Sequence, residues 1–135
     1  MAEHFVGEVA QKAIIEHDGK ILFTRSATDS KWDLPGGRLN AGEVPQAGLE
    51  REVLEELSLH IQAGSMVFIT PINASHFKFP RLFIFYTATL KNPEEHMSLQ
   101  KEEIAETKWF SKNQIDSVDT HAEWKLAIEA YLKLK

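Results

Sequence analysis

A helical segment with two unlike faces, residues 45–57, constrains the fold more than any other part of this chain. Pro45 suits the first turn of a helix, and Leu49, Val53 and Leu57 recur at helical spacing on one apolar arc. A helix of this length is not stable alone in water, because its apolar arc must be buried against another element. The rest of the chain therefore has to supply a surface that covers this arc.

Strand-like runs supply that surface, since they occur before, between and after two helical segments. Asp18-Gly19 between two apolar runs is a strong hairpin signal. A T-x-x-E pattern at Thr120 predicts a capping box that opens the second helix. The order of elements predicts an α/β (α+β) fold, in which a mixed central sheet lies between helices. The expected strands are residues 9–16, 20–24, 60–72, 81–90 and 106–110, the expected loops or breaks are residues 25–31, 32–37 and 73–80, and the second helix carries Trp124, Ala127, Ile128 and Tyr131 at helical spacing.

Length and composition limit the classes of protein. A chain of 135 residues predicts one domain, residues 1–135. The net charge of −5, from 20 acidic and 15 basic residues, argues against stable nucleic-acid binding or a membrane surface, which need a basic face. No cysteine is present, which excludes a thiol nucleophile and cysteine-ligated metals. No apolar run is long enough to span a bilayer and residues 1–9 do not resemble a secretory signal, so we expect a cytoplasmic protein.

Three carboxylates, those of Glu52, Glu55 and Glu56, share an arc of about 100° beside the apolar arc. Like charges at these spacings destabilise an isolated helix by about 0.2–0.5 kcal/mol per pair. The arc is either an ordinary solvated face or a surface that surrounds a bound cation. Carboxylate oxygens favour Mg²⁺ or Mn²⁺ over zinc. Arg51 carries a planar guanidinium that would hold one of these carboxylates in a fixed orientation.

The spacing around this helix favours the second interpretation, because residues 37–59 resemble the Nudix box. The family pattern is G-x5-E-x7-R-E-U-x-E-E-x-G-U, in which U is aliphatic. The chain matches it at every fixed position except one, where Ser58 stands in place of Gly. A Leu-Pro-Gly-Gly lead-in (residues 34–37) and an E-I-x-E-x-x-W-F segment (residues 103–110) extend the resemblance. The family's fold, an α/β/α sandwich with a catalytic loop–helix–loop, agrees with the element order above.

The resemblance implies a metal site on the acidic face. Glu52 and Glu56 match the principal ligands of the family, and Glu55 matches a further or water-mediated ligand. The backbone carbonyl of Gly36 matches a ligand in many members. Glu103 stands where many members have an extra acidic residue that binds metal or acts as general base, so Glu55 and Glu103 are both candidates for the base. Mg²⁺ is the expected cofactor, and Mn²⁺ is the expected substitute.

The resemblance also implies residues for the frame of the site and for the substrate. Arg51 and Glu43 match positions that brace the catalytic helix and its loop. A structural role is an equal or better alternative for three of the substrate candidates: Trp32 as a loop anchor, Phe77 in core packing and Asp119 at a helix start. The full set of candidate substrate contacts is Arg25, Gly37, Trp32, Phe77 and Asp119.

Ser58 is the one departure from the family pattern. A glycine just after the last turn of a helix usually adopts the left-handed conformation, which serine enters at a cost of about 1 kcal/mol. The residue has no ligand role in the pattern. We therefore expect Ser58 to have a positive φ, a small cost in stability and no effect on catalysis.

The function implied by the resemblance is Mg²⁺-dependent hydrolysis of a nucleoside diphosphate linked to another group. Cleavage of a (d)NTP to (d)NMP and pyrophosphate, as in nucleotide-pool sanitation, fits a small member, and ADP-ribose or an NDP-sugar is the alternative substrate. Dinucleoside polyphosphates and capped RNA stay open, and the net charge and small size disfavour capped RNA. A non-catalytic nucleotide-binding Nudix module is a further alternative, which the intact Glu52, Glu55 and Glu56 disfavour. An isomerase of this fold that acts on prenyl diphosphates is excluded, because its chemistry uses cysteine. The expected partner is a small-molecule nucleotide, and a homodimer is a family expectation.

Overall fold

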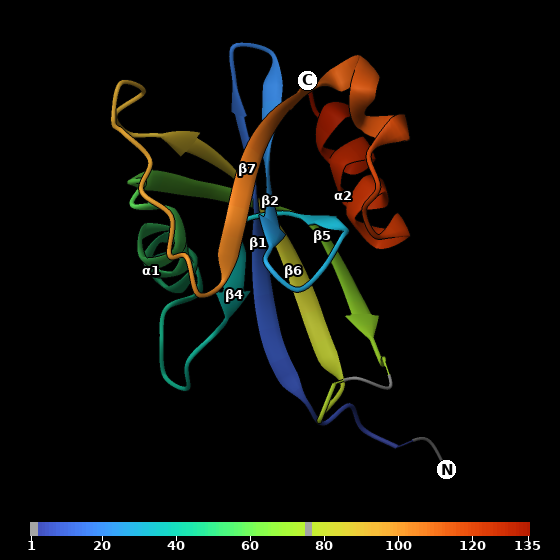
Figure 1. Cartoon of the computed structure of the whole chain (residues 1–135). Helices are drawn as coiled ribbons and strands as arrows, with labels where there is room; N and C mark the ends of the chain where they lie inside the picture. Colours follow the sequence, from blue (N-terminus) through green and yellow to red (C-terminus); the bar gives the residue numbers. More distant parts are fainter. Residues whose placement is uncertain (1–2, 75–76) are drawn as a thin grey trace.

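A mixed β-sheet packed between two helices forms the molecule (Figure 1). The computed structural model describes residues 3–74 and 77–135. Helix α1 (Pro45–Leu57) covers one face of the sheet, and α2 (Ala122–Leu132) covers the other. This arrangement confirms the predicted sandwich, and α1 has the bounds that the sequence predicts.

Strands and one short 3₁₀ helix make up the remaining regular structure of the described residues. They are β1 (Glu8–His17), β2 (Lys20–Ser26), β3 (Trp32–Asp33), β4 (Gly36–Arg38), β5 (Ile61–Ile72), β6 (Arg81–Leu90), β7 (Ile104–Ser111) and the 3₁₀ helix η1 (Lys112–Ser117). No helix within these described ranges is long and apolar enough to cross a membrane.

Part of one edge of β1 is not paired with β2. The main path through the sheet is β3-β2-β1-β6-β5, with β1 and β6 parallel and the other pairs antiparallel. β2 pairs with β1 only beside the hairpin, at Glu16 and His17. β4 therefore pairs with the free part of the same edge, from Ala10 to Lys12, while β7 adds to β2. This insertion brings the two glycines of β4 alongside the middle of β1.

The hairpin between β1 and β2 is confirmed. Asp18 has φ +51° and Gly19 has φ +74°, which is the pair of positive values that a two-residue type I′ turn requires. Glycine adopts such a φ without strain, and Asp is among the residues that tolerate it best. The turn fixes where β2 starts, and hence the point from which β2 diverges from β1.

Two apolar clusters fill the spaces between the sheet and the helices. The apolar arc of α1 is buried as predicted, since Leu49, Val53 and Leu57 are each 0% exposed. These side chains pack against the face of the sheet that includes Ile15 and Leu22. The other face packs against α2, and its cluster includes Ile14, Phe23, Phe83, Phe85, Trp124 and Ile128. β1 thus contributes alternate residues to both clusters, as a central strand does.

The structure differs from the prediction in residues 25–38. β2 extends through Arg25 and Ser26, because β7 pairs with it there, and the short strands β3 and β4 replace the predicted break. Pro35 and two glycines argue against regular structure in a sequence, but here glycine makes a strand possible. A Cβ on Gly36, whose φ is +141°, would overlap the carbonyl oxygen of Gln11 on β1. The predicted loop of residues 73–80 contains 75–76, which lie outside the described residues.

The predicted capping box at Thr120 is wrong. α2 begins at Ala122, and its N-cap, His121, makes no side-chain cap hydrogen bond. The hydroxyl of Thr120 instead donates to the carbonyl of Trp32 at 2.6 Å, because Thr120 is buried against β3. A capping box does form in the preceding 3₁₀ helix, between Ser111 and Gln114.

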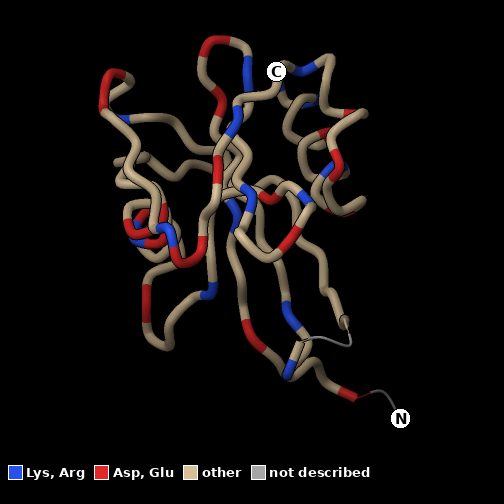
Figure 2. Tube along the Cα trace, in the orientation of Figure 1, with Lys and Arg blue, Asp and Glu red and all other residues tan. Residues whose placement is uncertain are grey.

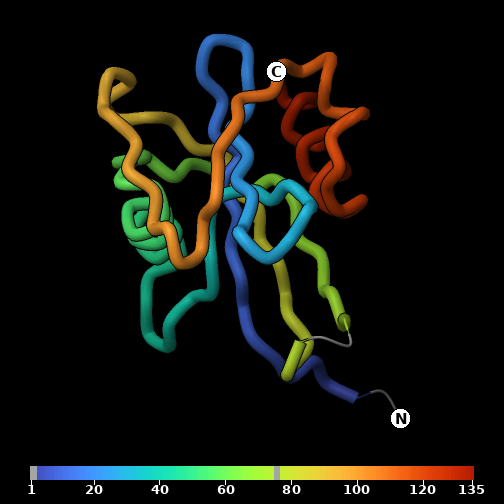
Figure 3. Tube along the Cα trace, in the orientation of Figure 1, coloured from blue at the N-terminus to red at the C-terminus, as the bar shows by residue number. Residues whose placement is uncertain are grey.

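Ser58 adopts the left-handed conformation that the sequence predicts. Its φ is +57° and its ψ is +31°, and its N–H donates to the carbonyl of Leu54 at 2.9 Å, which closes α1. The nearby segment between β6 and β7 uses the last carbonyls of this helix: Ser98 N–H donates to Leu57 O at 3.0 Å and Gln100 N–H to Glu56 O at 2.8 Å. The end of α1 thus also positions the chain that leads to β7 (Figure 3).

Replacing Ser58 with glycine should stabilise the protein. The Ser58→Gly variant removes strain of about 1–2 kcal/mol, and the greater freedom of glycine in the unfolded chain offsets part of this gain. We expect the free energy of unfolding to rise by up to about 1 kcal/mol in urea titrations. A clear fall would mean that the serine hydroxyl stabilises the helix end in solution.

A partly buried carboxylate holds the C-terminal helix against the sheet. Glu16 on β1 accepts hydrogen bonds from Tyr131 Oη at 2.5 Å and from Lys135 Nζ at 2.6 Å, and it pairs with Lys112 Nζ at 3.1 Å. Burial raises the pKa of Glu16, but the hydrogen bonds from Lys135, Tyr131 and Lys112 outweigh burial and lower this pKa to about 2. The carboxylate therefore stays ionised through most of the acidic range.

The effect of Glu16→Gln on stability should depend on pH. The folded-state pKa lies below the unfolded value near 4.5, so the stabilisation is present above pH 4.5 and is lost as pH falls toward 2. We expect the variant to lose about 1 kcal/mol at pH 7, since the two lysines are partly screened by solvent. The loss should shrink between pH 4.5 and pH 3 in urea titrations. Glu129→Gln, on the exposed side of α2, is the control and should show no such trend. If Glu16→Gln lowers the free energy of unfolding equally at pH 7 and at pH 3, this explanation is wrong.

Candidate active site

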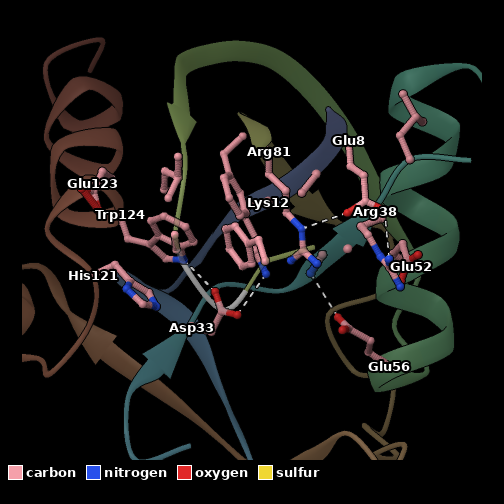
Figure 4. Close-up of a pocket in the computed structure, with 18 of the residues that line it drawn as sticks. Glu8, Lys12, Asp33, Arg38, Glu52, Glu56, Arg81, His121, Glu123 and Trp124 are labelled. Carbon is pink, nitrogen blue, oxygen red and sulfur yellow. Dashed lines mark hydrogen bonds and ion pairs between the residues drawn. The ribbon is translucent and has the colours of Figure 1, made fainter. Parts of the chain in front are cut away.

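A cavity of about 700 Å³ opens beside α1 and extends across β1 toward α2. Figure 4 shows its two ends: Glu52 and Glu56 project from α1 on one side, and His121 and Trp124 stand on the other. Lys12 and Asp33 lie between them. The cavity thus has an acidic end and an aromatic end, with an ion pair in the middle.

Glu56 is the most buried carboxylate of the acidic end. The residue is 8% exposed, and its Oε1 accepts a hydrogen bond from Gly36 N–H at 3.1 Å. Burial raises the pKa of Glu56 to about 7, against the opposing effects of Lys12 and the Gly36 N–H. A carboxylate held in this state gains from a nearby cation, because a cation removes the cost of burying the negative charge.

Glu52 lies one turn earlier on α1 and packs directly on β4. A Cβ on Gly37 would lie 2.5 Å from Glu52 Oε2, so only glycine leaves room for this carboxylate. Burial raises the pKa of Glu52, as do the charges of Glu55 and Glu103, although Arg51 lowers it. The two glycines of β4 therefore touch both carboxylates, Gly36 by a hydrogen bond and Gly37 by close packing.

Arg51 and Glu43 brace the loop that precedes α1. The guanidinium of Arg51 binds Glu43 in a two-point contact, Nε to Oε2 at 2.6 Å and Nη2 to Oε1 at 3.0 Å. Glu43 also accepts a hydrogen bond from Asn40 N–H at 3.0 Å, which ties the loop to itself. The hydrogen bonds from Arg51 and from the Asn40 N–H lower the pKa of Glu43 to about 2. These contacts are those expected of bracing residues.

Glu55 and Glu103 occupy different environments. Both carboxylate oxygens of Glu55 lie 3.0 Å from Arg51 Nη1, its side chain is half exposed, and it does not line the cavity. Glu103 does line the cavity, from the turn before β7. Its N–H donates to Gln100 O at 2.9 Å, and Gln100 is itself bonded to the end of α1. The acidic end of the cavity therefore consists of Glu52, Glu56 and Glu103, and Glu55 belongs to the brace.

The donors at the acidic end fit a hard divalent cation. Within residues 3–74 and 77–135, no three His, Cys, Asp or Glu side chains are gathered into a ready metal-binding group. Glu52 and Glu56, however, are oxygen donors with raised pKa values, and Gly36 places a backbone carbonyl on the adjoining strand. Oxygen ligands of this kind suit Mg²⁺ or Mn²⁺, which keep several water ligands of their own. A metal site on Glu52, Glu56 and the Gly36 carbonyl is compatible with this chemistry, and Glu55 would reach it only through water or by releasing Arg51.

The structure divides the predicted substrate contacts into two groups. Gly37 and Phe77 line the cavity, and Phe77 also packs near Phe83, with ring centroids 6.2 Å apart. The other three are not part of its lining. Arg25 pairs with Glu106 at 2.6 Å, Trp32 packs edge-on against Phe110, and Asp119 O accepts a hydrogen bond from Trp32 N–H at 2.8 Å. These three residues adjoin one another beside β3.

Several residues that line the cavity were not predicted from the sequence. Asp33 accepts hydrogen bonds from Lys12 Nζ and Trp124 Nε1, and Glu8 pairs with both Arg38 and Arg81. One signal was present in the sequence: a lysine stands inside the apolar run of residues 9–16. The arginines gave no such signal, because each lies at the end of a strand where a charged residue is common. Lining residues that were not predicted include Glu8, Lys12, Asp33, Arg38, Arg81 and Trp124.

The fold and the site together define a class of protein: a sandwich in which a glycine loop and a helix present buried carboxylates to a cavity. The chain belongs to the Nudix family, whose NUDIX domain model matches residues 9–132. Nudix hydrolases generally need a divalent metal, in agreement with the donors described above.

Two curated relatives illustrate the range of the similarity. The chain is 32% identical over 103 residues to CTP pyrophosphohydrolase of Escherichia coli (strain K12). The matched stretch covers 73% of this chain and 72% of that protein. It is 27% identical over 122 residues to the NAD-capped RNA hydrolase NudC of Mycobacterium tuberculosis, which covers 87% of this chain and 37% of NudC. The chain thus spans about a third of the length of some curated relatives that it matches.

Solved structures share the fold. The MutT protein of Methanosarcina mazei Go1 superposes with a TM-score of 0.79 at 22% identity, covering 98% of this chain and 97% of that one. At this identity the likeness establishes the architecture alone. It agrees with the sheet order and the two helix layers described above.

Proposed function

We propose that the chain is a Mg²⁺-dependent pyrophosphohydrolase that cleaves a nucleoside diphosphate linked to another group, most favourably a (d)NTP to (d)NMP and pyrophosphate. The observation that carries the proposal is a pair of carboxylates, the buried Glu56 and the partly buried Glu52, held against the two glycines of β4 at one end of the cavity. The name of the E. coli relative, CTP pyrophosphohydrolase, supports this choice of substrate. ADP-ribose or an NDP-sugar is the alternative.

The reaction is the attack of water on phosphorus, with rupture of one P–O–P bridge and departure of pyrophosphate. A divalent cation supplies neutralisation of the phosphate oxygens and acidifies a water molecule. Glu52 and Glu56 would hold the cation, and the Arg51–Glu43 contact would keep α1 and its loop in register. Glu103 is the better candidate for the base that takes the proton from water, because it lines the cavity while Arg51 occupies both oxygens of Glu55.

A substrate panel tests the proposal. The panel contains NTPs, dNTPs, 8-oxo-dGTP, ADP-ribose, NDP-sugars and dinucleoside polyphosphates, each with Mg²⁺ or Mn²⁺, and the readout is release of phosphate or pyrophosphate. Pyrophosphate released from a (d)NTP is the expected result. Binding of nucleotides without turnover of any compound would instead indicate the non-catalytic module. The single domain, the cytoplasmic location and the homodimer expected from the sequence stay predictions.

The Glu56→Gln variant should separate stability from activity. Without metal at pH 8 it should be at least as stable as wild type, because the raised pKa makes the wild-type charge costly above about pH 7. This advantage should be smaller at pH 5, where wild-type Glu56 is protonated. Turnover should fall by at least ~10²-fold and the Mg²⁺ requirement should shift to higher concentration, since an electrostatic contact at the reacting centre is lost.

Glu50→Gln is the matched control for this variant. Glu50 lies on the same helix and accepts a hydrogen bond from Ala63 N–H at 2.9 Å, which the glutamine carbonyl can still accept. It should change neither turnover nor Mg²⁺ dependence much. Equal activity of the two variants at limiting Mg²⁺ would remove Glu56 from the metal site.

Glu103→Gln should lower kcat by ~10- to 10³-fold with little change in the Mg²⁺ requirement, because it removes a proton acceptor and not a principal ligand. Its exposed neighbour supplies the control, Glu102→Gln, which should behave as wild type. The measurement is kcat and the Mg²⁺ concentration dependence of turnover on the best substrate of the panel. An unchanged kcat would shift the role of base to Glu55.

A further inference from the structure

Lys12 occupies a position on β1 that the fold would otherwise fill with an apolar side chain. Glu8, Ala10 and Lys12 alternate along one face of the strand and all line the cavity. The next residue on that face, Ile14, is fully buried in the apolar cluster under α2. Lys12 is itself only 8% exposed, so its ammonium group lies inside the cavity and not at the protein surface.

The ammonium group of Lys12 has donors to spare. Its Nζ donates to Asp33 Oδ2 at 3.0 Å, and Asp33 is the one hydrogen-bond partner found for it within the described part of the chain. A lysine has three N–H donors. Asp33, by contrast, is held by three donors, because its Oδ1 also accepts hydrogen bonds from Trp124 Nε1 at 2.6 Å and from Leu34 N–H at 2.7 Å. The fixed carboxylate therefore holds the ammonium in place, and further donors of Lys12 are available to a ligand.

Lys12 also lies next to the acidic end of the cavity. It is the cross-strand partner of Gly36, the residue whose N–H donates to Glu56. Figure 4 shows Lys12 and Asp33 between the carboxylates of α1 and the aromatic side chains of α2. A phosphate chain that began at Glu52 and Glu56 and ran toward the aromatic end would pass this ammonium group.

Stability alone does not account for a lysine at this position. A buried ion pair is often no more stabilising than apolar residues of the same volume, because both charges must leave water. The flanking Ala10 and Ile14 show that this face of β1 accepts apolar side chains. The other cations of the cavity, Arg38 and Arg81, share Glu8 at its rim, and Arg38 is 62% exposed. Lys12 is the buried cation nearest the acidic end.

We propose that Lys12 is a substrate-binding residue whose Nζ donates to a non-bridging phosphate oxygen of the nucleotide, between the phosphates held at the acidic end and the nucleoside. This inference rests on the proposed function for the identity of the ligand. Asp33 is then the counter-ion of Lys12 in the absence of nucleotide, held in place by Leu34 N–H and Trp124 Nε1, and it does not contact the phosphate. The charge of Lys12 offsets that of Asp33, so the middle of the cavity repels an anion less than it would without the lysine.

Two variants that break the same ion pair distinguish this role from a structural one. Lys12→Met removes the cation, whereas Asp33→Asn keeps the cation and can keep an acceptor for Trp124 and Leu34. The probe is inorganic pyrophosphate in the presence of Mg²⁺, with binding measured by calorimetry and folding checked by thermal melting. Lys20→Met, at the exposed start of β2, removes the same charge and is the control. If Lys12→Met lacks a cooperative melting transition, Lys12→Gln replaces it with the same expectation.

The proposal predicts opposite results for the two variants. Lys12→Met should bind pyrophosphate at least ~10-fold more weakly, the loss typical of one charged hydrogen bond, and should raise KM on the best substrate more than it lowers kcat. Asp33→Asn should bind within about threefold of wild type or more tightly, because the freed ammonium has lost its competing anion. Equal weakening by both variants, no weakening by Lys12→Met, or no binding of pyrophosphate by wild type would each overturn the proposal.

These outcomes are independent of whether the chain hydrolyses nucleotides. The binding measurement needs no turnover, so a substrate panel without activity would reject the proposed function and leave the pyrophosphate comparison valid. A positive panel together with equal binding by the two variants would reject the role of Lys12 alone.

Discussion

The contact between β4 and the acidic face of α1 determines the rest of the site. Gly36 donates its N–H to Glu56, and Gly37 leaves the space that the Glu52 carboxylate fills. A side chain at Gly36 would push β4 from the backbone of β1, and one at Gly37 would displace the Glu52 carboxylate. Glu56 can be buried and Glu52 partly buried here because the two residues of β4 that contact them are glycines. Their raised pKa values follow chiefly from this burial, and a cation bound beside them would relieve its cost.

This contact depends in turn on how β2 leaves β1. The type I′ hairpin at Asp18 and Gly19 starts β2 in register with β1, but the two strands stay paired for only two residue pairs. The free edge of β1 then receives β4, and the segment from β3 to β4 carries Asp33 to Lys12. The acidic end and the ion pair of the cavity are therefore consequences of one topological feature. A sheet in which β2 followed β1 along its full length would leave no place for β4.

Local signals in the sequence predicted the parts of the fold that local physics controls. The helix of residues 45–57, the hairpin and the positive φ of Ser58 depend on periodicity, turn chemistry and chain chirality, and each is confirmed. The capping box at Thr120 failed because a tertiary partner, the carbonyl of Trp32, competes for the hydroxyl. β4 and the cavity lining were missed for a related reason, since they arise from strand pairing between distant segments. The box pattern located the carboxylates, but it gave no information about Lys12, Asp33 or the arginines.

Helical periodicity does not distinguish the environments of Glu52, Glu55 and Glu56 on α1, whereas in the structure each has different neighbours and a different exposure. An arc of about 100° is wide enough for its two edges to meet different neighbours. Glu56 faces β4 and is buried, Glu52 lies between β4 and Arg51, and Glu55 is turned toward solvent, where Arg51 binds both of its oxygens. Arg51 thus neutralises the exposed carboxylate of Glu55. Glu52 and Glu56 line the cavity, where the proposed cation would neutralise them. The protein has a net charge of −5, and its Lys and Arg residues are spread over the fold (Figure 2). Under the proposed function, Lys12 and the cation proposed at Glu52 and Glu56 would offset the acidic lining of the cavity where a polyanion would bind.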